Sequence, residues 1–118
     1  MKFYADGSGW NGRESGFCVI SSDGFKKIEF DNAELTNNSM EYIAVIKALE
    51  LCNNGDEIYT DSRLIFGQMI FGWKINKPEL RLFKIKACEL MIKKNAKIFW
   101  IPREENLAGI ELENHKRY

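Results

Sequence analysis

Residues 36–41 read Thr-Asn-Asn-Ser-Met-Glu, and they open the segment with the clearest helical pattern in the chain. At about 100° per residue, Glu41 points in the same direction as Val45, Ala48 and Cys52, which form the apolar side that should face the core. A carboxylate on that side requires a partner, because an unpaired buried charge is costly. The role of Glu41 is therefore the first question that this sequence poses.

Two interpretations of Glu41 follow from the residues around it. Asn38 and Glu41 have the spacing of a capping box, in which the acid bonds back to the first backbone N–H of the helix. The second interpretation includes Asp6 and Asp61, each of which ends a short β-prone run where a strand passes into a turn or helix. Three carboxylates at one end of a sheet predict a magnesium site, because Mg²⁺ prefers hard oxygen ligands.

The length and composition predict one compact domain. The chain has 118 residues, of which 45% are hydrophobic, enough for a single core over residues 1–118. No signal peptide is evident, and no apolar run approaches the roughly 20 residues that span a bilayer. We therefore expect a cytoplasmic protein without membrane contact. The three cysteines lack a short metal-type spacing, which disfavours a zinc site or a disulfide framework.

Charge is balanced overall but uneven along the chain. Residues 1–62 contain five basic and eleven acidic residues, whereas residues 63–103 contain ten basic and two acidic residues. An acidic pole that holds cations beside a basic face that follows phosphates would suit a nuclease. The alternative is that the basic residues are a solvated helix face.

Local patterns predict alternating strands and helices. Strands are expected at residues 1–6, 17–21, 25–30, 57–60 and 96–101, and helices at about residues 39–52, 62–73 and 78–94, with a last helix that starts near residue 104 or 105. The first three strands should form a meander, because Ser22-Asp23-Gly24 is a typical hairpin turn.

Three blocks in this order resemble the type 1 ribonucleases H. They are YADGSG at residues 4–9, LTNNSMEYIAVIKALEL at residues 35–51 and YTDS at residues 59–62. The resemblance covers nearly the whole chain. It implies an α/β fold, the RNase H-like fold, with a five-stranded mixed sheet flanked by helices. In this sheet a three-strand antiparallel meander is extended by two parallel strands.

The resemblance also implies an activity. Ribonucleases H are endonucleases that hydrolyse the RNA strand of RNA/DNA hybrids and leave 5′-phosphate and 3′-hydroxyl ends. They use two divalent ions, Mg²⁺ or Mn²⁺, when substrate is bound. In this chain Asp6 would bridge both ions, and Glu41 and Asp61 would each bind one.

The family also binds the hybrid through short polar side chains and backbone near the first acid. Carried over to this chain, these contacts are Gly7, Ser8, Thr36, Asn37 and Asn38. Such groups can reach a 2′-hydroxyl, the donor that distinguishes RNA from DNA. Helix capping is the alternative for both asparagines.

The last helix departs from the family pattern. Many members have a fourth carboxylate, an Asp, in this helix, but this chain has Gly109 there or, counted from Asn106, Ile110. We expect Glu113 to be the substitute ligand, because it lies one turn beyond Gly109 and helical side chains lean toward the N-terminus. Glu111 is the second choice, and both acids being solvated is the alternative.

Two further functions stay open. The family's mobile loop with a histidine is absent, since the single histidine is His115 near the C-terminus. With the fourth Asp also missing, the chain could be a catalytically impaired RNase H-like module that binds nucleic acid without cutting. A nuclease of the same fold that acts on another structured nucleic acid is also possible, because fold does not determine substrate. We expect a monomer, as no long exposed apolar stripe is evident.

Overall fold

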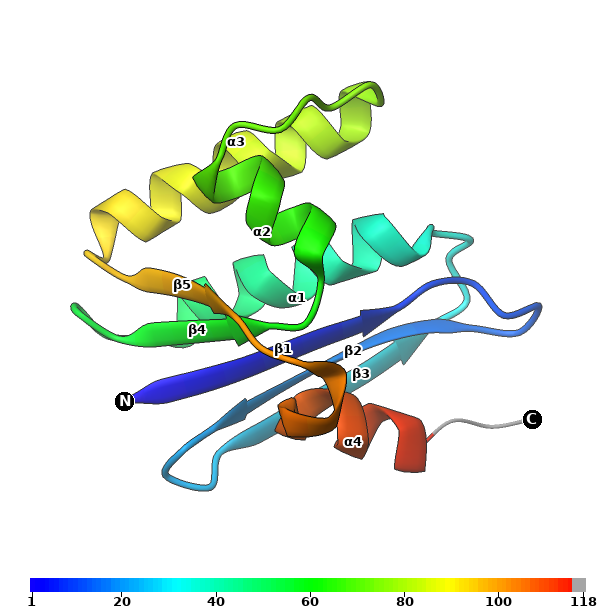
Figure 1. The fold of residues 1–118 in the computed structure, drawn as a ribbon. Coiled ribbons are helices and arrows are strands. Elements are labelled where there is room, and N and C mark those ends of the chain that lie inside the picture. The colour runs from blue at the N-terminus through cyan, green and yellow to red at the C-terminus, as the bar shows by residue number, and fades with distance from the viewer. Residues whose placement is uncertain (116–118) are drawn as a thin grey trace.

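The computed structural model describes residues 1–115, and its sheet has five strands. In chain order the elements are β1 (Lys2–Ser8), β2 (Ser15–Ser21), β3 (Lys26–Asp31), α1 (Asn37–Leu51), β4 (Glu57–Thr60), α2 (Arg63–Ile70), α3 (Pro78–Lys93), β5 (Lys97–Trp100), the 3₁₀ turn η1 (Arg103–Glu105) and α4 (Leu107–Asn114). Figure 1 shows this arrangement.

The sheet has the strand order β3-β2-β1-β4-β5. Strands β1, β2 and β3 form an antiparallel meander, and β4 and β5 continue the sheet parallel to β1. The turn between β2 and β3 uses Gly24 at a φ of 94°, which a glycine adopts readily. The predicted fold class is confirmed, and the predicted strand positions agree to within about two residues.

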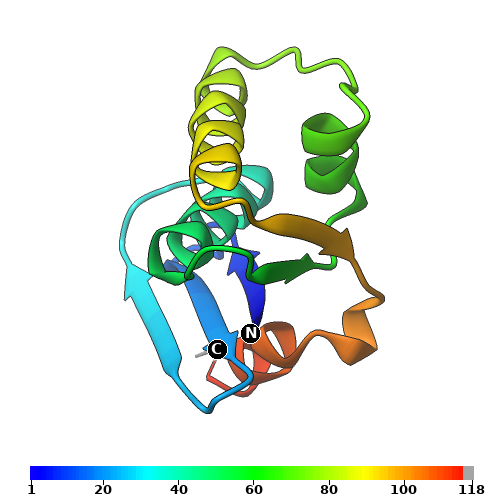
Figure 2. The same ribbon diagram turned by 90° about the vertical axis from the view of Figure 1, so that its left-hand side faces the viewer.

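Helices cover both faces of the sheet. Helix α1 lies against one face and α3 packs on α1, whereas α4 lies on the opposite face (Figures 1 and 2). The main core therefore lies between the sheet and α1, and a smaller cluster of Cys18, Ala108 and Leu112 lies under α4. Strand β2 is almost wholly buried because it is covered on both faces. All three cysteines are free thiols.

The end of β1 is pressed against the first turn of α1. A Cβ atom on Gly7 would lie 2.2 Å from the backbone of Met40, and one on Gly9 would lie 2.4 Å from the Asn37 nitrogen. Only residues without a side chain allow backbones to approach so closely. The two glycines therefore determine how near the start of α1 lies to β1.

The start of α1 corrects two predictions. The helix begins at Asn37 rather than near Ser39, and Thr36 is its N-cap, with Oγ1 accepting the Ser39 N–H at 3.1 Å. The capping box between Asn38 and Glu41 is wrong. Threonine competes well for this position because its hydroxyl reaches the backbone two or three residues ahead, and Glu41 bonds elsewhere.

Helices α2 and α4 also differ from the prediction. Helix α2 ends at Ile70 instead of continuing to Trp73, because Gly72 has a φ of 69° and the Trp73 ring packs where a Gly67 side chain would be. Helix α4 starts at Leu107, after the 3₁₀ turn, instead of near residue 104. Across residues 1–115, no helix is long and apolar enough to cross a membrane.

Candidate metal centre and nucleic-acid interface

Three acids from three elements meet at one end of the sheet. Asp6 lies on β1 just past its last pairing with β4, Glu41 lies on α1, and Asp61 follows β4. Each offers a carboxylate oxygen, and these oxygens lie within 4.8 Å of one another. The structure thus brings together the three acids that the sequence singled out. Strand β1 continues to Ser8, so Asp6 lies within a strand and not at its end.

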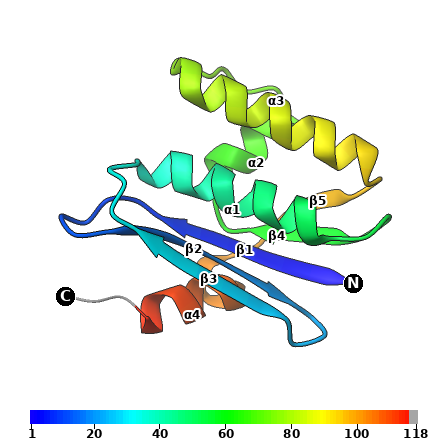
Figure 3. The ribbon, with the colours of Figure 1, turned by 180° about the vertical axis from the view of Figure 1, so that it is seen from behind.

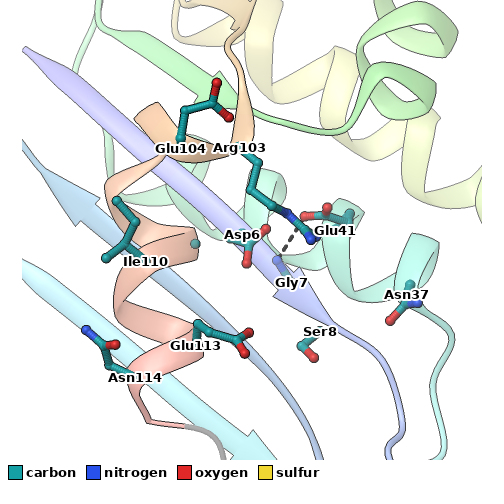
Figure 4. A pocket seen from close by; sticks show the side chains of 11 residues that line it. Asp6, Gly7, Ser8, Asn37, Glu41, Arg103, Glu104, Ile110, Glu113 and Asn114 are labelled. Atoms are coloured by element: carbon teal, nitrogen blue, oxygen red, sulfur yellow. Dashed lines mark hydrogen bonds between the residues drawn. The ribbon is translucent and has the colours of Figure 1, made fainter.

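The carboxylate of Glu41 is held by the backbone of β1. Its Oε1 accepts the Gly7 N–H at 2.9 Å (Figure 4). This bond joins residues that are 34 positions apart, and it depends on the close approach that Gly7 allows. The acid that seemed misplaced on the inner side of α1 therefore has a partner on the neighbouring strand.

Burial and electrostatic repulsion both act on the carboxylate of Glu41. Burial, followed by the nearby charge of Asp6, raises the pKa of Glu41 to about 9, while the Gly7 N–H and the Arg103 charge act in the opposite direction. Carboxylates close together cannot all be ionised without a compensating cation. Hard oxygen donors that repel one another around a common point fit a divalent ion such as Mg²⁺ or Mn²⁺.

Asn106 is a site residue that the sequence did not reveal. Its side chain is fully buried, and Nδ2 donates to Asp61 Oδ2 at 3.0 Å and to the Ala5 carbonyl at 2.9 Å. Its Oδ1 accepts the Ala108 N–H at 3.2 Å and caps α4. An Asn just before a helix is a recognisable cap signal, but the bonds to β1 and Asp61 depend on tertiary packing.

The first turn of α4 has a glycine, Gly109, at the position that faces the acids. A Cβ atom on Gly109 would lie 3.4 Å from Asp61 Oδ2 and 3.5 Å from Asp6 Oδ2. This is the space where a fourth carboxylate would start. Ile110 lines the same cavity and is exposed. Neither residue has a side-chain atom that can bind a metal.

The two candidate substitutes on α4 lie in different surroundings. Glu113 lines the cavity and points into it (Figure 4), although its carboxylate is outside the group of three ligand atoms within 4.8 Å. Glu111 faces β3, where it pairs with Lys26 at 2.5 Å, and it also pairs with His115, the C-cap of α4, at 2.9 Å. Between the two, Glu113 is the acid with access to the site.

The cavity at this end of the sheet has a volume of about 550 Å³. Of the predicted nucleic-acid contacts, Gly7, Ser8 and Asn37 line it, whereas Thr36 and Asn38 do not. Asn37 Oδ1 accepts the Gly9 N–H at 2.7 Å, which connects this residue to β1. Thr36 lies next to the cavity, as the cap of α1.

Arg103 is the second site residue that the sequence did not reveal. It is the one cation among the described lining residues, and its side chain extends toward Asp6 and Glu41 (Figure 4). It lies in η1, which follows β5 and brings it across the end of the sheet. The signal for this role in the sequence is a basic residue directly after Pro102, which ends the last strand.

Known proteins resemble this chain along most of its length. A model of the RNase H family matches residues 1–108. Ribonuclease HI of Halobacterium salinarum is 32% identical in an alignment of 106 positions that covers 84% of this chain and 53% of the relative. The chain thus spans about half the length of this curated relative.

Solved structures of RNase H1 proteins also resemble this chain along most of its length. The crystal structure of RNase H1 from the halophilic archaeon Halobacterium salinarum has a TM-score of 0.73 and 30% identity, with coverage of 94% of this chain and 92% of that one. LC11-RNase H1, isolated from compost and solved in complex with an RNA/DNA hybrid, has a TM-score of 0.77 and 30% identity, with coverage of 94% and 91%.

Proposed function

Because the chain belongs to the RNase H family, we propose that it is an endoribonuclease that hydrolyses the RNA strand of RNA/DNA hybrids. The observation that carries this proposal is the meeting of Asp6, Glu41 and Asp61, whose carboxylate oxygens lie within 4.8 Å of one another. The relative LC11-RNase H1 was solved with such a hybrid, which supports the substrate class.

The proposed cofactor is a pair of divalent ions, Mg²⁺ or Mn²⁺, bound together with the substrate. Asp6 would bridge the two ions, and Glu41 and Asp61 would hold one each. When bound, such ions lower the pKa of the attacking water and neutralise charge on the leaving oxygen. The expected products are a 5′-phosphate and a 3′-hydroxyl.

Neighbouring groups keep two of the three acids, Glu41 and Asp61, in place. The Gly7 N–H orients Glu41, and the Asn106 amide orients Asp61. Hydrogen bonds to ligating carboxylates tune metal affinity because they limit the orientations of the ligand. The positive charge of Arg103 favours the ionised form of Glu41, the form that binds a metal. We propose Glu113 as the fourth ligand, reaching the site from α4.

We propose that the hybrid lies across the cavity and the start of α1. Gly7, Ser8 and Asn37 would contact it from the cavity, and Thr36 and Asn38 from the adjoining turn. Polar side chains and backbone groups of this kind can bond a 2′-hydroxyl or a phosphate. Residues 1–118 would then act as a single cytoplasmic catalytic domain and as a monomer, which sedimentation can test.

The decisive experiment is cleavage of a labelled RNA/DNA hybrid by the purified protein in Mg²⁺ and in Mn²⁺. Single-stranded RNA, double-stranded RNA and double-stranded DNA are tested in parallel. We expect cleavage of the hybrid alone, abolished by Asp6→Asn and retained by Asp31→Asn, which changes an exposed acid on β3 in the same way. Unchanged activity in Asp6→Asn would refute the site.

The second candidate function is hybrid binding without cleavage. The observation that favours it is the open space at Gly109, where no side chain completes the group of acids. This function predicts that a folded protein binds the hybrid and cleaves it in neither Mg²⁺ nor Mn²⁺. The same assay therefore separates the two candidates.

A further inference from the structure

Helix α3 packs on the core through one side only. Leu80 and Ala87 are buried, and Phe83, Leu90 and Met91 pack against the core. These positions follow helical spacing and lie on the side toward α1. Packing in the core thus explains the apolar residues of the inner side and leaves the outer side to be explained.

The outer side of α3 carries three large aliphatic residues. Leu82, Ile85 and Ile92 are 69%, 53% and 76% exposed. They lie on one side of the helix and span about 15 Å along its axis, and α3 is the outermost helix on its face of the sheet (Figure 3). The sequence did not reveal this stripe. Apolar residues occur on both sides of α3, so the sequence does not show which side faces the core. Aligned exposed apolar residues mark an interaction site more often than scattered ones do.

A cavity opens beside the stripe. It has a volume of about 340 Å³ and is lined by Ile85 of the stripe and by Trp73, Ile75, Arg81 and Lys84. Its Trp73 wall is held in place, since the ring packs against Gly67 and the backbone N–H of Trp73 donates to the Gly67 carbonyl at 3.2 Å. A rigid aromatic wall next to aliphatic residues is suited to receive an apolar anchor from a partner.

Cations flank the stripe on both sides. A helical wheel puts Arg81 and Lys84 on the cavity side and Lys86 and Lys93 on the other side. Glu89 is the one acid within the stripe. Lys86 also pairs with Glu50 of α1 at 3.9 Å. A partner that covers the aliphatic residues would still meet mainly positive charge at its edges, and its own edges should be acidic.

We propose that the outer side of α3 with its Trp73 cavity, here called the α3 surface, docks an acidic amphipathic segment of a partner protein. The segment would place aliphatic residues on Leu82, Ile85 and Ile92 and carboxylates beside the flanking cations. This binding mode resembles that of amphipathic helices that lay their apolar side on a hydrophobic surface.

Charge and chemistry disfavour the other occupants. A second copy of this chain, paired by two-fold symmetry, would bring the same four cations of each α3 together. A nucleic acid would satisfy the cations and could stack on Trp73, but its backbone offers nothing to cover aliphatic side chains. An acidic amphipathic segment matches both the cations and the stripe.

The test is selection from a displayed library of peptides about 16 residues long, long enough for a marginal helix. The full chain is the target, and the variant Ile85→Gln/Ile92→Gln is the counter-target. Both substitutions are at exposed positions and introduce a good helix former, so the variant should fold, which circular dichroism checks. Leu64→Gln, at another exposed apolar position on a helix, is the matched control.

We expect enrichment of peptides that combine aliphatic residues at helical spacing with several acids. Their affinity, measured by fluorescence anisotropy, should fall more than about tenfold in Ile85→Gln/Ile92→Gln and in Lys86→Glu/Lys93→Glu, and stay unchanged in Leu64→Gln. Hybrid cleavage should not change in Ile85→Gln/Ile92→Gln or in Leu64→Gln. The proposal is overturned if no peptide prefers the full chain to its counter-target, if charge reversal leaves affinity unchanged, or if the stripe variant loses hybrid binding instead.

Discussion

The Nδ2 group of Asn106 donates a hydrogen bond of 3.0 Å to Asp61 Oδ2 and joins the cap of α4 to the acid that follows β4. The same group donates to the Ala5 carbonyl on β1. One buried amide therefore connects α4, β1 and the loop after β4. Gly109 offers no side chain to the acids, so the buried Asn106 amide is what connects α4 with Asp61.

Asn106→Ala should weaken both the fold and the metal site. It removes the helix cap and leaves buried polar groups unpaired, so the free energy of unfolding should fall by about 2–4 kcal/mol. Affinity for Mn²⁺ should fall about tenfold, because Asp61 loses a positioning hydrogen bond. Urea denaturation and calorimetric titration with Mn²⁺ measure these effects. Asn32→Ala, in an exposed loop, is the control, and an equal loss in both variants would contradict this role.

The raised pKa of Glu41 predicts how the stability of the metal-free protein depends on pH. Because the pKa is higher in the folded state than in the unfolded state, the favourable contribution is complete below the unfolded pKa and is lost as pH rises toward 9. The midpoint of thermal unfolding should thus decrease between about pH 5 and pH 9 in EDTA. Asp6→Asn should reduce this dependence without abolishing it, because burial of Glu41 is the larger cause, and Mn²⁺ should oppose it. A profile that is the same in Asp6→Asn would contradict the repulsion between the two acids.

Glu113→Gln should raise the Mg²⁺ concentration required for half-maximal cleavage by about tenfold, because a ligand contributed from α4 would be lost. Glu111→Gln is the matched control, since Glu111 pairs with Lys26 and His115 instead of lining the cavity. Cleavage is measured over a range of Mg²⁺ concentrations, with Mn²⁺ binding by calorimetry as a second measurement. If the two variants behave alike, Glu113 is not a ligand.

Gly7→Ala should disrupt the junction of β1 and α1. The added Cβ would lie 2.2 Å from the Met40 backbone, so the helix must move and the bond between the Gly7 N–H and Glu41 must weaken. Overpacking of this kind costs about 1–3 kcal/mol or more, and cleavage should be largely lost. Gly109→Ala, whose Cβ makes contacts of 3.4–3.5 Å, should keep the stability. Thermal unfolding compares them, and a fully stable Gly7→Ala would disagree with this geometry.

Local signals in the sequence were sufficient for most of the fold. The hairpin turn at Gly24 and the alternation of β-prone and helical segments each depend on residues close together in the chain. The capping box of Glu41 was wrong because its partner lies on a distant strand, 34 positions away, whereas the helix ends were decided by contacts closer in the chain. Helix α2 ends early because Trp73 folds back on Gly67, and this packing is not encoded in helical periodicity.

The sequence by itself determined the order of the elements and singled out Asp6, Glu41 and Asp61, and its resemblance to the type 1 ribonucleases H implied the mixed sheet. Tertiary structure alone decided that the partner of Glu41 is the Gly7 N–H and not Asn38, and that Asn106 reaches Ala5 across 101 positions. The physical reason is range. Propensities and turn chemistry act over a few residues, whereas hydrogen bonds and electrostatic repulsion at the site depend on distances that exist only after β1, β4, α1 and α4 have packed together.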